Sequence, residues 1–172
     1  MSTIDKYYHK IKYLILEYDT ILLQDIQYMN DYLKYYGNDL NTNNNTLLDK
    51  YNTKLLKNDE IFYDKTEIDS ISKLFYKPLA KLLHPDKNNN KSDEFIKINK
   101  AYEKNDYLTL FLFYYEKKIN IKITNDILNI IKNEIEKKEN EINSIKNKIH
   151  WQWANSNDVE KELIHEYIKN NL

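Results

Sequence analysis

The chain of 172 residues has no cysteine, one glycine and two prolines. The absence of cysteine excludes disulfides, cysteine zinc sites and thiol chemistry. The single glycine, Gly37, cannot build a glycine-rich phosphate-binding loop. Sheet proteins need turn residues repeatedly, and this chain has almost none. The scarcity of turn residues therefore predicts an all-α fold.

The chain also lacks arginine, a charge bias and a long apolar run. All 26 basic residues are lysine; with 27 acidic residues the net charge is −1, which argues against a generic nucleic-acid-binding protein. The longest apolar run, Tyr107–Tyr115, falls short of the roughly 20 residues of a membrane span. Residues 1–10 carry no signal-peptide core. We expect a soluble, cytoplasmic protein with no nucleic-acid or membrane partner.

Composition also suggests a source. The abundance of lysine, asparagine, isoleucine and tyrosine is typical of an AT-rich genome, such as that of a large DNA virus or a protist. For a viral chain, the expected location is the host cytoplasm.

Apolar periodicity predicts three segments, 1–45, 46–120 and 121–172. The first is a long amphipathic helix over 2–36, stopped at Gly37, followed by an asparagine-rich loop. Its apolar residues recur at steps of three and four, as expected for one helix face: Tyr8, Ile11, Ile15, Tyr18, Leu22, Ile26, Met29, Leu33 and Tyr36.

The third segment carries a heptad pattern and a short terminal helix. The heptad positions hold Leu128, Ile131, Ile135, Ile142, Ile145 and Ile149, with Lys138 at a missing apolar position, which is the minimum coiled-coil signature. The terminal helix, capped by Asn157, carries an apolar face of Val159, Leu163, Ile164, Tyr167 and Ile168. Packing of the two arms as an antiparallel pair within one chain is the simplest arrangement, and a homodimer is the alternative.

Shorter helices are expected in the middle segment. A moderate signal covers 47–57. A helix capped by Thr66 spans 67–83, and its end is set by Pro85, which disfavours a helical residue before it. Further helices are expected over 93–104, capped by Ser92, and over 107–118, after a break at 105–106.

The most informative stretch lies between residues 73 and 102. Lys73, Lys77 and Lys81 are spaced by four, so their ammonium groups line one helix face, with Leu79, Leu82 and Leu83 largely away from it. The next helix offers the apolar residues Phe95, Ile98, Ala101 and Tyr102. The two apolar faces can close as an antiparallel hairpin whose turn projects His84, Pro85 and Asp86 beside the lysines.

These residues carry a family resemblance. The core of the match spans 66–104 and reads Tyr76-Lys77-Pro78-Leu79-Ala80, then His84-Pro85-Asp86-Lys87, then Phe95-Ile96-Lys97-Ile98-Asn99-Lys100-Ala101-Tyr102. The joint pattern resembles the J-domain, the DnaJ-type co-chaperone module. The family's first-helix motif, Tyr-(Tyr/Glu)-x-Leu-Gly, is missing; residues 47–62 or the N-terminal helix would take its place. Pro78 inside the basic helix is a further departure, and it would bend the helix axis.

The resemblance implies a function and a set of site residues. A J-domain binds the ATP state of a heat-shock-70 (DnaK-type) chaperone and stimulates ATP hydrolysis. It would contact this chaperone through Lys73, Lys77, Lys81, His84, Pro85, Asp86 and Lys87. Its core would contain Tyr76, Leu79, Ala80, Leu83, Phe95, Ile98, Ala101 and Tyr102. The chain would break no bond itself and would need no cofactor, and the arms would select the client protein, the location or the oligomer.

Other interpretations remain open. A helical scaffold protein could retain a J-like hairpin for packing only, and burial of the turn would favour it. A metal site at His84 and Asp86 lacks a third ligand, and a catalytic dyad there lacks a nucleophile. His9, His150 and His165 are expected at the surface or at helix ends, and Trp151 and Trp153 as packing anchors.

Overall fold

The structure is a computed structural model that describes residues 2–40, 69–85, 93–120 and 122–171, with the side chains of 37–40 and 168–171 left undescribed. The described residues confirm the all-α fold, since they form helices and connecting turns without a strand. The helices are α1 (Thr3–Leu40), α3 (Ser70–Leu83), α4 (Asp93–Glu103), α5 (Tyr107–Glu116), α6 (Asn125–Lys146), α7 (Ile149–Ala154) and α8 (Asp158–Asn171). No described helix combines the length and the apolar character needed to cross a membrane.

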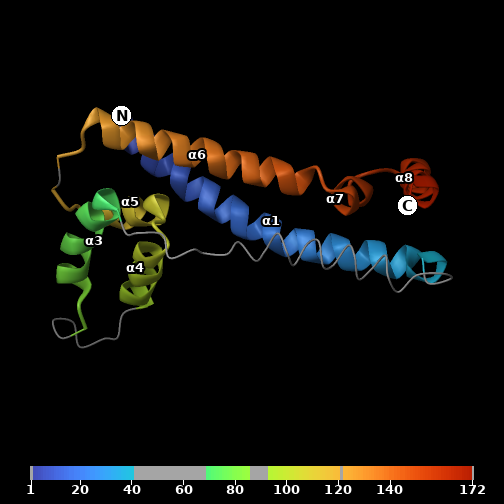
Figure 1. Cartoon of the computed structure of the whole chain (residues 1–172), viewed down its shortest axis with the longest axis horizontal. Coiled ribbons are helices and arrows are strands. Elements are labelled where there is room, and N and C mark those ends of the chain that lie inside the picture. Colours follow the sequence, from blue (N-terminus) through green and yellow to red (C-terminus); the bar gives the residue numbers. More distant parts are fainter. Residues whose placement is uncertain (1, 41–68, 86–92, 121, 172) are drawn as a thin grey trace. The chain divides into compact units, whose positions relative to one another are not determined.

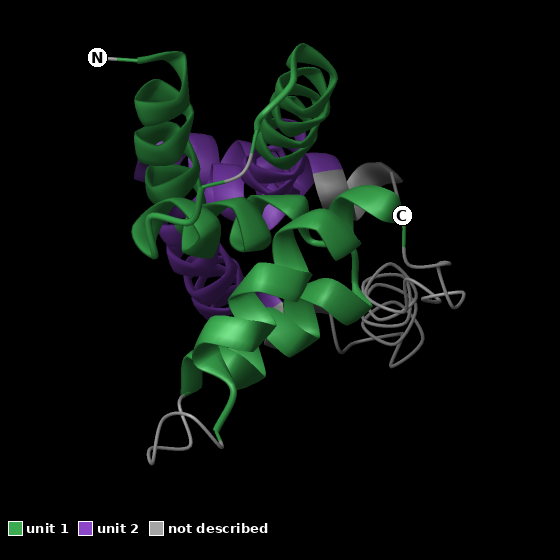
Figure 2. Cartoon of the chain, turned by 90° about the vertical axis from the view of Figure 1, so that its left-hand side faces the viewer, with its two compact units in different colours: residues 1–15, 63–139 green, residues 16–62, 140–172 purple. Residues whose placement is uncertain are grey.

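The chain divides into two compact units (Figure 2). Unit 1 comprises Met1–Ile15 and Tyr63–Glu139, and unit 2 comprises Leu16–Phe62 and Asn140–Leu172. Helices α1 and α6 contribute residues to both units, so the units cut across the three predicted segments.

Unit 1 is built around α3, α4 and α5, each of which packs against the other two (Figure 1). Phe75 from α3 lies edge-on to Phe111 of α5, with ring centroids 6.0 Å apart. Leu79 of α3 and Ile98 of α4 are also fully buried in this unit. The first residues of α1 and the first half of α6 add further buried side chains to this unit, namely Ile11, Leu14, Ile127, Ile131 and Ile135.

One asparagine and one aspartate make the turn between α4 and α5. Asn105 adopts a positive φ of 51°, and the following backbone N–H, of Asp106, donates to the carbonyl of Ala101 at 2.8 Å. This is the left-handed ending that asparagine tolerates after a helix. The Asp106 carboxylate then accepts from the Thr109 N–H at 3.0 Å and caps α5. The predicted break and fresh cap at 105–106 are confirmed.

Unit 2 contains an aromatic cluster between α1, α7 and α8. Tyr32, Tyr36 and Trp153 form its buried centre, and Trp151 contacts Tyr28 beside it. The Trp153 indole N–H donates to the Tyr36 hydroxyl at 3.3 Å. The expectation that both tryptophans anchor packing is confirmed.

The direction of packing in unit 2 corrects a prediction. Glu17 pairs with Lys146 at 2.9 Å, Asp25 with Lys148 at 2.6 Å, and Tyr36 contacts Trp153. Residue numbers rise together on both sides, so α1 runs parallel to the segment leading from α6 into α8. The predicted antiparallel pairing was wrong, because an apolar stripe indicates which faces pack but looks the same from either end of the helix.

The ends of several helices differ from the prediction. Helix α1 continues through Gly37 to Leu40, since glycine disfavours a helix interior by only about 1 kcal/mol. Helix α6 ends at Lys146, so Ile149 leaves the heptad series and is partly exposed. Residues 47–57 and the proposed caps Thr66 and Ser92 lie outside the described residues.

Candidate functional site

Helices α3 and α4 form an antiparallel hairpin (Figure 1). At its turn, the His84 ring lies edge-on to the Phe95 ring, with centroids 5.5 Å apart. Farther along, Tyr76 stacks on Tyr102 at 3.9 Å and donates its hydroxyl to the Asn99 side chain at 2.8 Å. Burial is the largest cause that raises the pKa of Tyr76, and the neighbouring Tyr102 raises it further.

The structure brings the sequence-predicted core residues of the hairpin together. Leu79, Leu83, Ile98 and Ala101 are buried, and the remaining four are half-buried: Tyr76, Ala80, Phe95 and Tyr102. Fully burying a leucine or isoleucine side chain is worth about 1.5–3 kcal/mol. Apolar burial therefore holds the two helices together.

Asp69 anchors the end of the hairpin away from the turn. Its carboxylate caps α3 by accepting from the N–H groups of Ile71 and Ser72 at 3.0 and 2.8 Å. The Tyr107 hydroxyl donates to the same carboxylate. Burial and this bond raise the pKa of Tyr107 well above its ordinary value. Helix α3 thus begins at Ser70 rather than at the predicted residue 67, because the extended backbone of Asp69 excludes an earlier start.

The three lysines of α3 form an open cationic face. Lys73, Lys77 and Lys81 are all exposed, and none forms an ion pair with a described residue. Helix α3 runs without interruption through Pro78, so the spacing of four keeps the lysines on one side. Leu82, expected to lie away from the lysines, is also exposed beside them.

The predicted turn residues come directly after α3 in the sequence. Pro85 ends α3 at Leu83 as predicted, and His84 already has an extended ψ of 131°. The His84 side chain is exposed and Pro85 is half-buried. Asp86 and Lys87, the other two predicted contact residues, lie outside the described residues.

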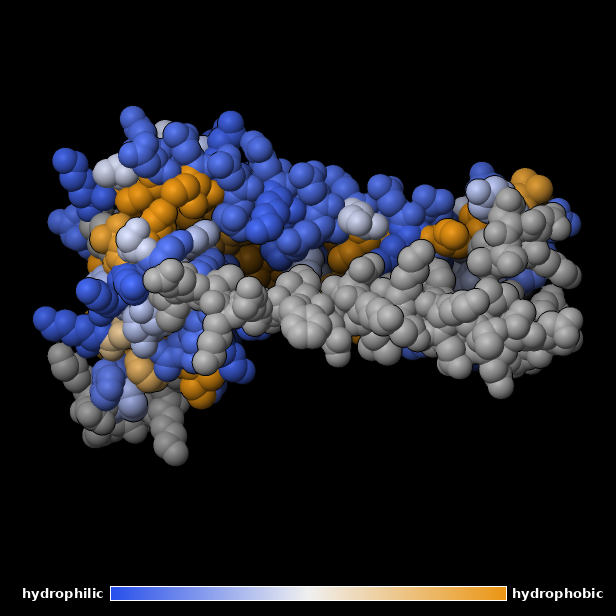
Figure 3. Space-filling view, viewed as in Figure 1, coloured by the Kyte–Doolittle hydropathy of each residue, from blue (hydrophilic) through white to orange (hydrophobic). Residues whose placement is uncertain are grey.

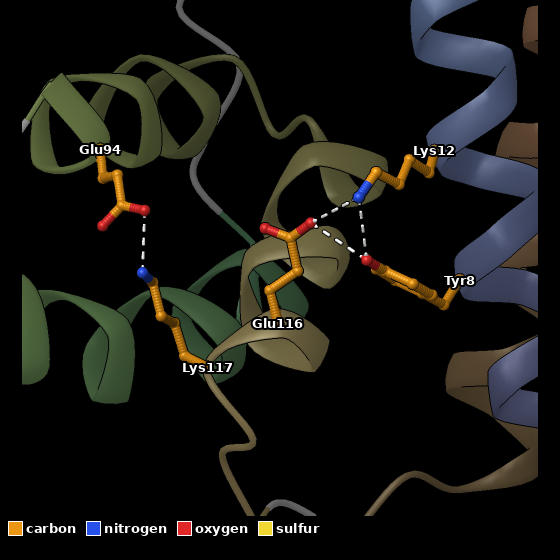
Figure 4. A network of polar contacts seen from close by, with 5 residues as sticks. All are labelled: Tyr8, Lys12, Glu94, Glu116 and Lys117. Carbon is orange, nitrogen blue, oxygen red and sulfur yellow. Dashed lines mark hydrogen bonds and ion pairs between the residues drawn. The ribbon is translucent and has the colours of Figure 1, made fainter.

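Polar contacts within unit 1 join α1 and α4 to the end of α5 (Figure 4). Lys117, just after α5, pairs with Glu94 of α4 at 2.8 Å. Glu116 accepts from the Tyr8 hydroxyl at 3.1 Å and pairs with Lys12 at 3.5 Å. Partly exposed ion pairs of this kind contribute little to stability, because solvent screens them. They position the first part of α1, which belongs to unit 1, against the end of α5.

A second polar cluster, in unit 2, was missed by sequence reasoning. His150 and Lys148 both contact the Asp25 carboxylate, each at 2.6 Å. His150 is buried, and burial lowers its pKa more than the Asp25 bond raises it. His165 is buried as well and stacks on Tyr36 at 3.7 Å. The expected surface or helix-end position was wrong for His165, which is buried within α8, because a histidine carries no sequence signal of burial. His150 does lie at the start of α7, although it is buried, and His9 is exposed.

The described residues contain no group of three histidine, aspartate or glutamate side chains that could hold a metal ion. What the hairpin offers chemically is a binding surface, with a row of positive charge, an imidazole and a proline at one end. Comparison with known proteins identifies no family, because no family model, curated protein or solved structure matches the chain.

Proposed function

We propose that the protein is a J-domain-type co-chaperone that binds a heat-shock-70 chaperone and stimulates its ATP hydrolysis. The observation that carries the proposal is the open cationic face of α3. Its three ammonium groups are exposed and form no ion pair with a described residue, and they adjoin an exposed His84 at the hairpin turn. Charges left exposed in this way are available to a partner.

Each group has a distinct role in the proposed contact. The lysines meet an acidic surface of the chaperone, which mainly raises the rate of association. Lysine provides point charges there, without the bidentate geometry of arginine. Pro85 ends the helix, so that the exposed His84 lies at the turn. In the proposed contact, Asp86 pairs with a cation of the partner. The co-chaperone acts by binding one conformational state of the chaperone better than the other.

The competing function is a helical scaffold that retains the hairpin for packing. A scaffold gains nothing from an exposed imidazole beside exposed lysines. The exposure of His84 therefore favours the co-chaperone over the scaffold.

Single-turnover ATP hydrolysis by heat-shock-70 chaperones tests the proposal. We expect the wild-type protein to stimulate hydrolysis and the variants His84→Gln and Asp86→Asn to lose at least about tenfold of that stimulation. The reason is that a charge-assisted hydrogen bond is worth roughly 1.5–3 kcal/mol.

Matched controls come from the same chain. His9→Gln and Asp126→Asn alter an exposed histidine and an exposed aspartate outside the hairpin and should leave stimulation intact. Circular dichroism on the same preparations checks that helicity is retained. Full stimulation by both hairpin variants would contradict the co-chaperone function and favour the scaffold.

A further inference from the structure

Helix α8 has one face on the core of unit 2 and one face at the surface. Ile164 packs against the aromatic cluster and His165 is buried on Tyr36. Val159, Leu163 and Tyr167 are instead 72%, 59% and 65% exposed. These three residues follow one another at steps of four, so they form an apolar stripe two turns long, about 12 Å.

The charges beside this stripe are acidic. Asp158, Glu162 and Glu166 each precede a stripe residue by one position, and all three are exposed. Glu162 also lies 3.5 Å from the Tyr36 hydroxyl. The nearby base, Lys161, turns toward the core, where its ammonium group lies 5.0 Å from the Trp153 ring. The surface face of α8 is therefore apolar with a row of carboxylates along one side.

Helix α3 shows the same pattern with the opposite charge. Leu74 and Leu82 are 38% and 46% exposed, and the half-buried Pro78 lies between them at the same steps of four. The lysines 73, 77 and 81 each precede one of these residues by one position. Position by position, the lysine row of α3 matches the carboxylate row of α8.

We propose that α8 of one copy of this chain docks on α3 of a second copy. When two helices pack antiparallel, rows that flank the apolar stripes at equivalent positions face each other along one side. The alignment sets Lys73 opposite Glu166, Lys77 opposite Glu162 and Lys81 opposite Asp158. Pairing of α8 with a second α8 would instead bring carboxylates together, so charge complementarity selects α3 as the occupant.

This contact joins different surfaces of the two copies, so it builds rings or chains of molecules rather than a two-fold dimer. The stripe is short and the ion pairs are exposed, so the association should be concentration-dependent and weakened by salt. The inference does not depend on the proposed function. Since the lysine face is shared, self-association and chaperone binding would exclude each other.

Sedimentation velocity of the full chain, over a range of concentrations and salt, tests the docking. We expect the wild type to form species larger than the monomer, and Lys77→Glu or Glu162→Lys alone to weaken association by roughly tenfold, because an attractive pair becomes repulsive. Mixing the two variants should restore association, since every α3 then finds an α8 of opposite charge. Leu163→Ser should also weaken it, whereas Lys97→Glu, an exposed lysine on α4, should not.

Circular dichroism of each variant excludes unfolding as the cause. A wild type that stays monomeric at every concentration would overturn the proposal. So would an oligomer that survives both charge reversals, or a mixture of the two variants that associates no better than either alone. The test does not measure ATPase stimulation, so the outcome of the sedimentation experiment is independent of the proposed co-chaperone function.

Discussion

Asp25 lies on the core-facing side of α1, at a position where periodicity predicts an apolar residue. The buried line of the helix in unit 2 passes through Ile21, Tyr32 and Tyr36. Asp25 falls on this line, four residues after Ile21, with its carboxylate held by Lys148 and His150. The predicted stripe avoided the charged position and ran through Ile26, which the structure leaves 61% exposed. A carboxylate with two partners can occupy a core-facing position that periodicity assigns to an apolar residue.

The polar cluster of Asp25, Lys148 and His150 makes the stability of the protein pH-dependent. The pKa of His150 is lowered from 6.5 in the folded state, so the unfolded chain binds the proton more tightly. His150 thus favours folding fully above about pH 6.5, and this contribution is lost as the pH falls through 6.5 toward the lower folded pKa. Urea denaturation at about pH 7.5 and about pH 5.5 should show a lower free energy of unfolding at the acidic pH.

A variant separates this histidine from other acid-sensitive groups. In His150→Gln, which has no group titrating in that range, the loss of stability between the two pH values should shrink. The matched variant His9→Gln, at an exposed site, should titrate as the wild type does. An unchanged pH dependence in His150→Gln would show that the buried histidine is not its source.

At the scale of the elements, the long helices α1, α6 and α8 are amphipathic, but the position of the buried face of each helix depends on its neighbours. The outward surface of α6 is almost entirely hydrophilic (Figure 3), as its charged residues predict. Buried Ile131, Ile135, Ile142 and Ile145 confirm most of its heptad positions, with Ile127 buried in place of the first predicted residue, Leu128. Helix α8 differs more, because three of the residues expected to be buried are exposed and His165 is buried instead.

This assignment for α8 predicts unequal effects of two adjacent substitutions. Ile164→Ala removes a side chain packed on the aromatic cluster and should lower the free energy of unfolding by about 1–2 kcal/mol. Leu163→Ala truncates an exposed side chain and should change it by less than about 0.5 kcal/mol. Both are measured by urea denaturation at a protein concentration at which the chain is monomeric. Equal losses, or a larger loss for Leu163→Ala, would show that the helix is rotated from the position described.

At the scale of the whole molecule, acidic and basic residues nearly cancel, so any electrostatic steering arises from local charge. The α3 lysines are such a local charge. Screening acts over about 8 Å at physiological ionic strength, so association driven by these lysines slows as salt rises.

Reversal of two lysines tests this steering on the proposed chaperone. Lys77→Glu with Lys81→Glu should reduce the association rate constant roughly tenfold or more at low salt and flatten its dependence on salt. Stopped-flow binding at concentrations below self-association provides the measurement. Charge reversal at Lys97 and Lys132, both exposed on other helices, is the matched control. If the rate is indifferent to salt and to the α3 reversal alike, the lysine face takes no part in binding.

The sequence by itself determined the fold class and the hairpin turn. Scarcity of glycine and proline excludes repeated tight turns, and Pro85 bars a helical conformation at His84 wherever the chain lies in space. The asparagine and aspartate at 105–106 end one helix and cap the next through bonds to nearby backbone. These features are local, so a few neighbouring residues are enough to specify them.

Only the tertiary structure decided the parallel course of α1 and the later helices in unit 2, the pairing of Asp25, the burial of His150 and His165, and the exposed stripe of α8. Each depends on residues more than a hundred positions apart. A charged or aromatic group leaves water at a favourable free energy only when it contacts a suitable partner. That partner lies far away in the sequence, and periodicity within one helix cannot identify it.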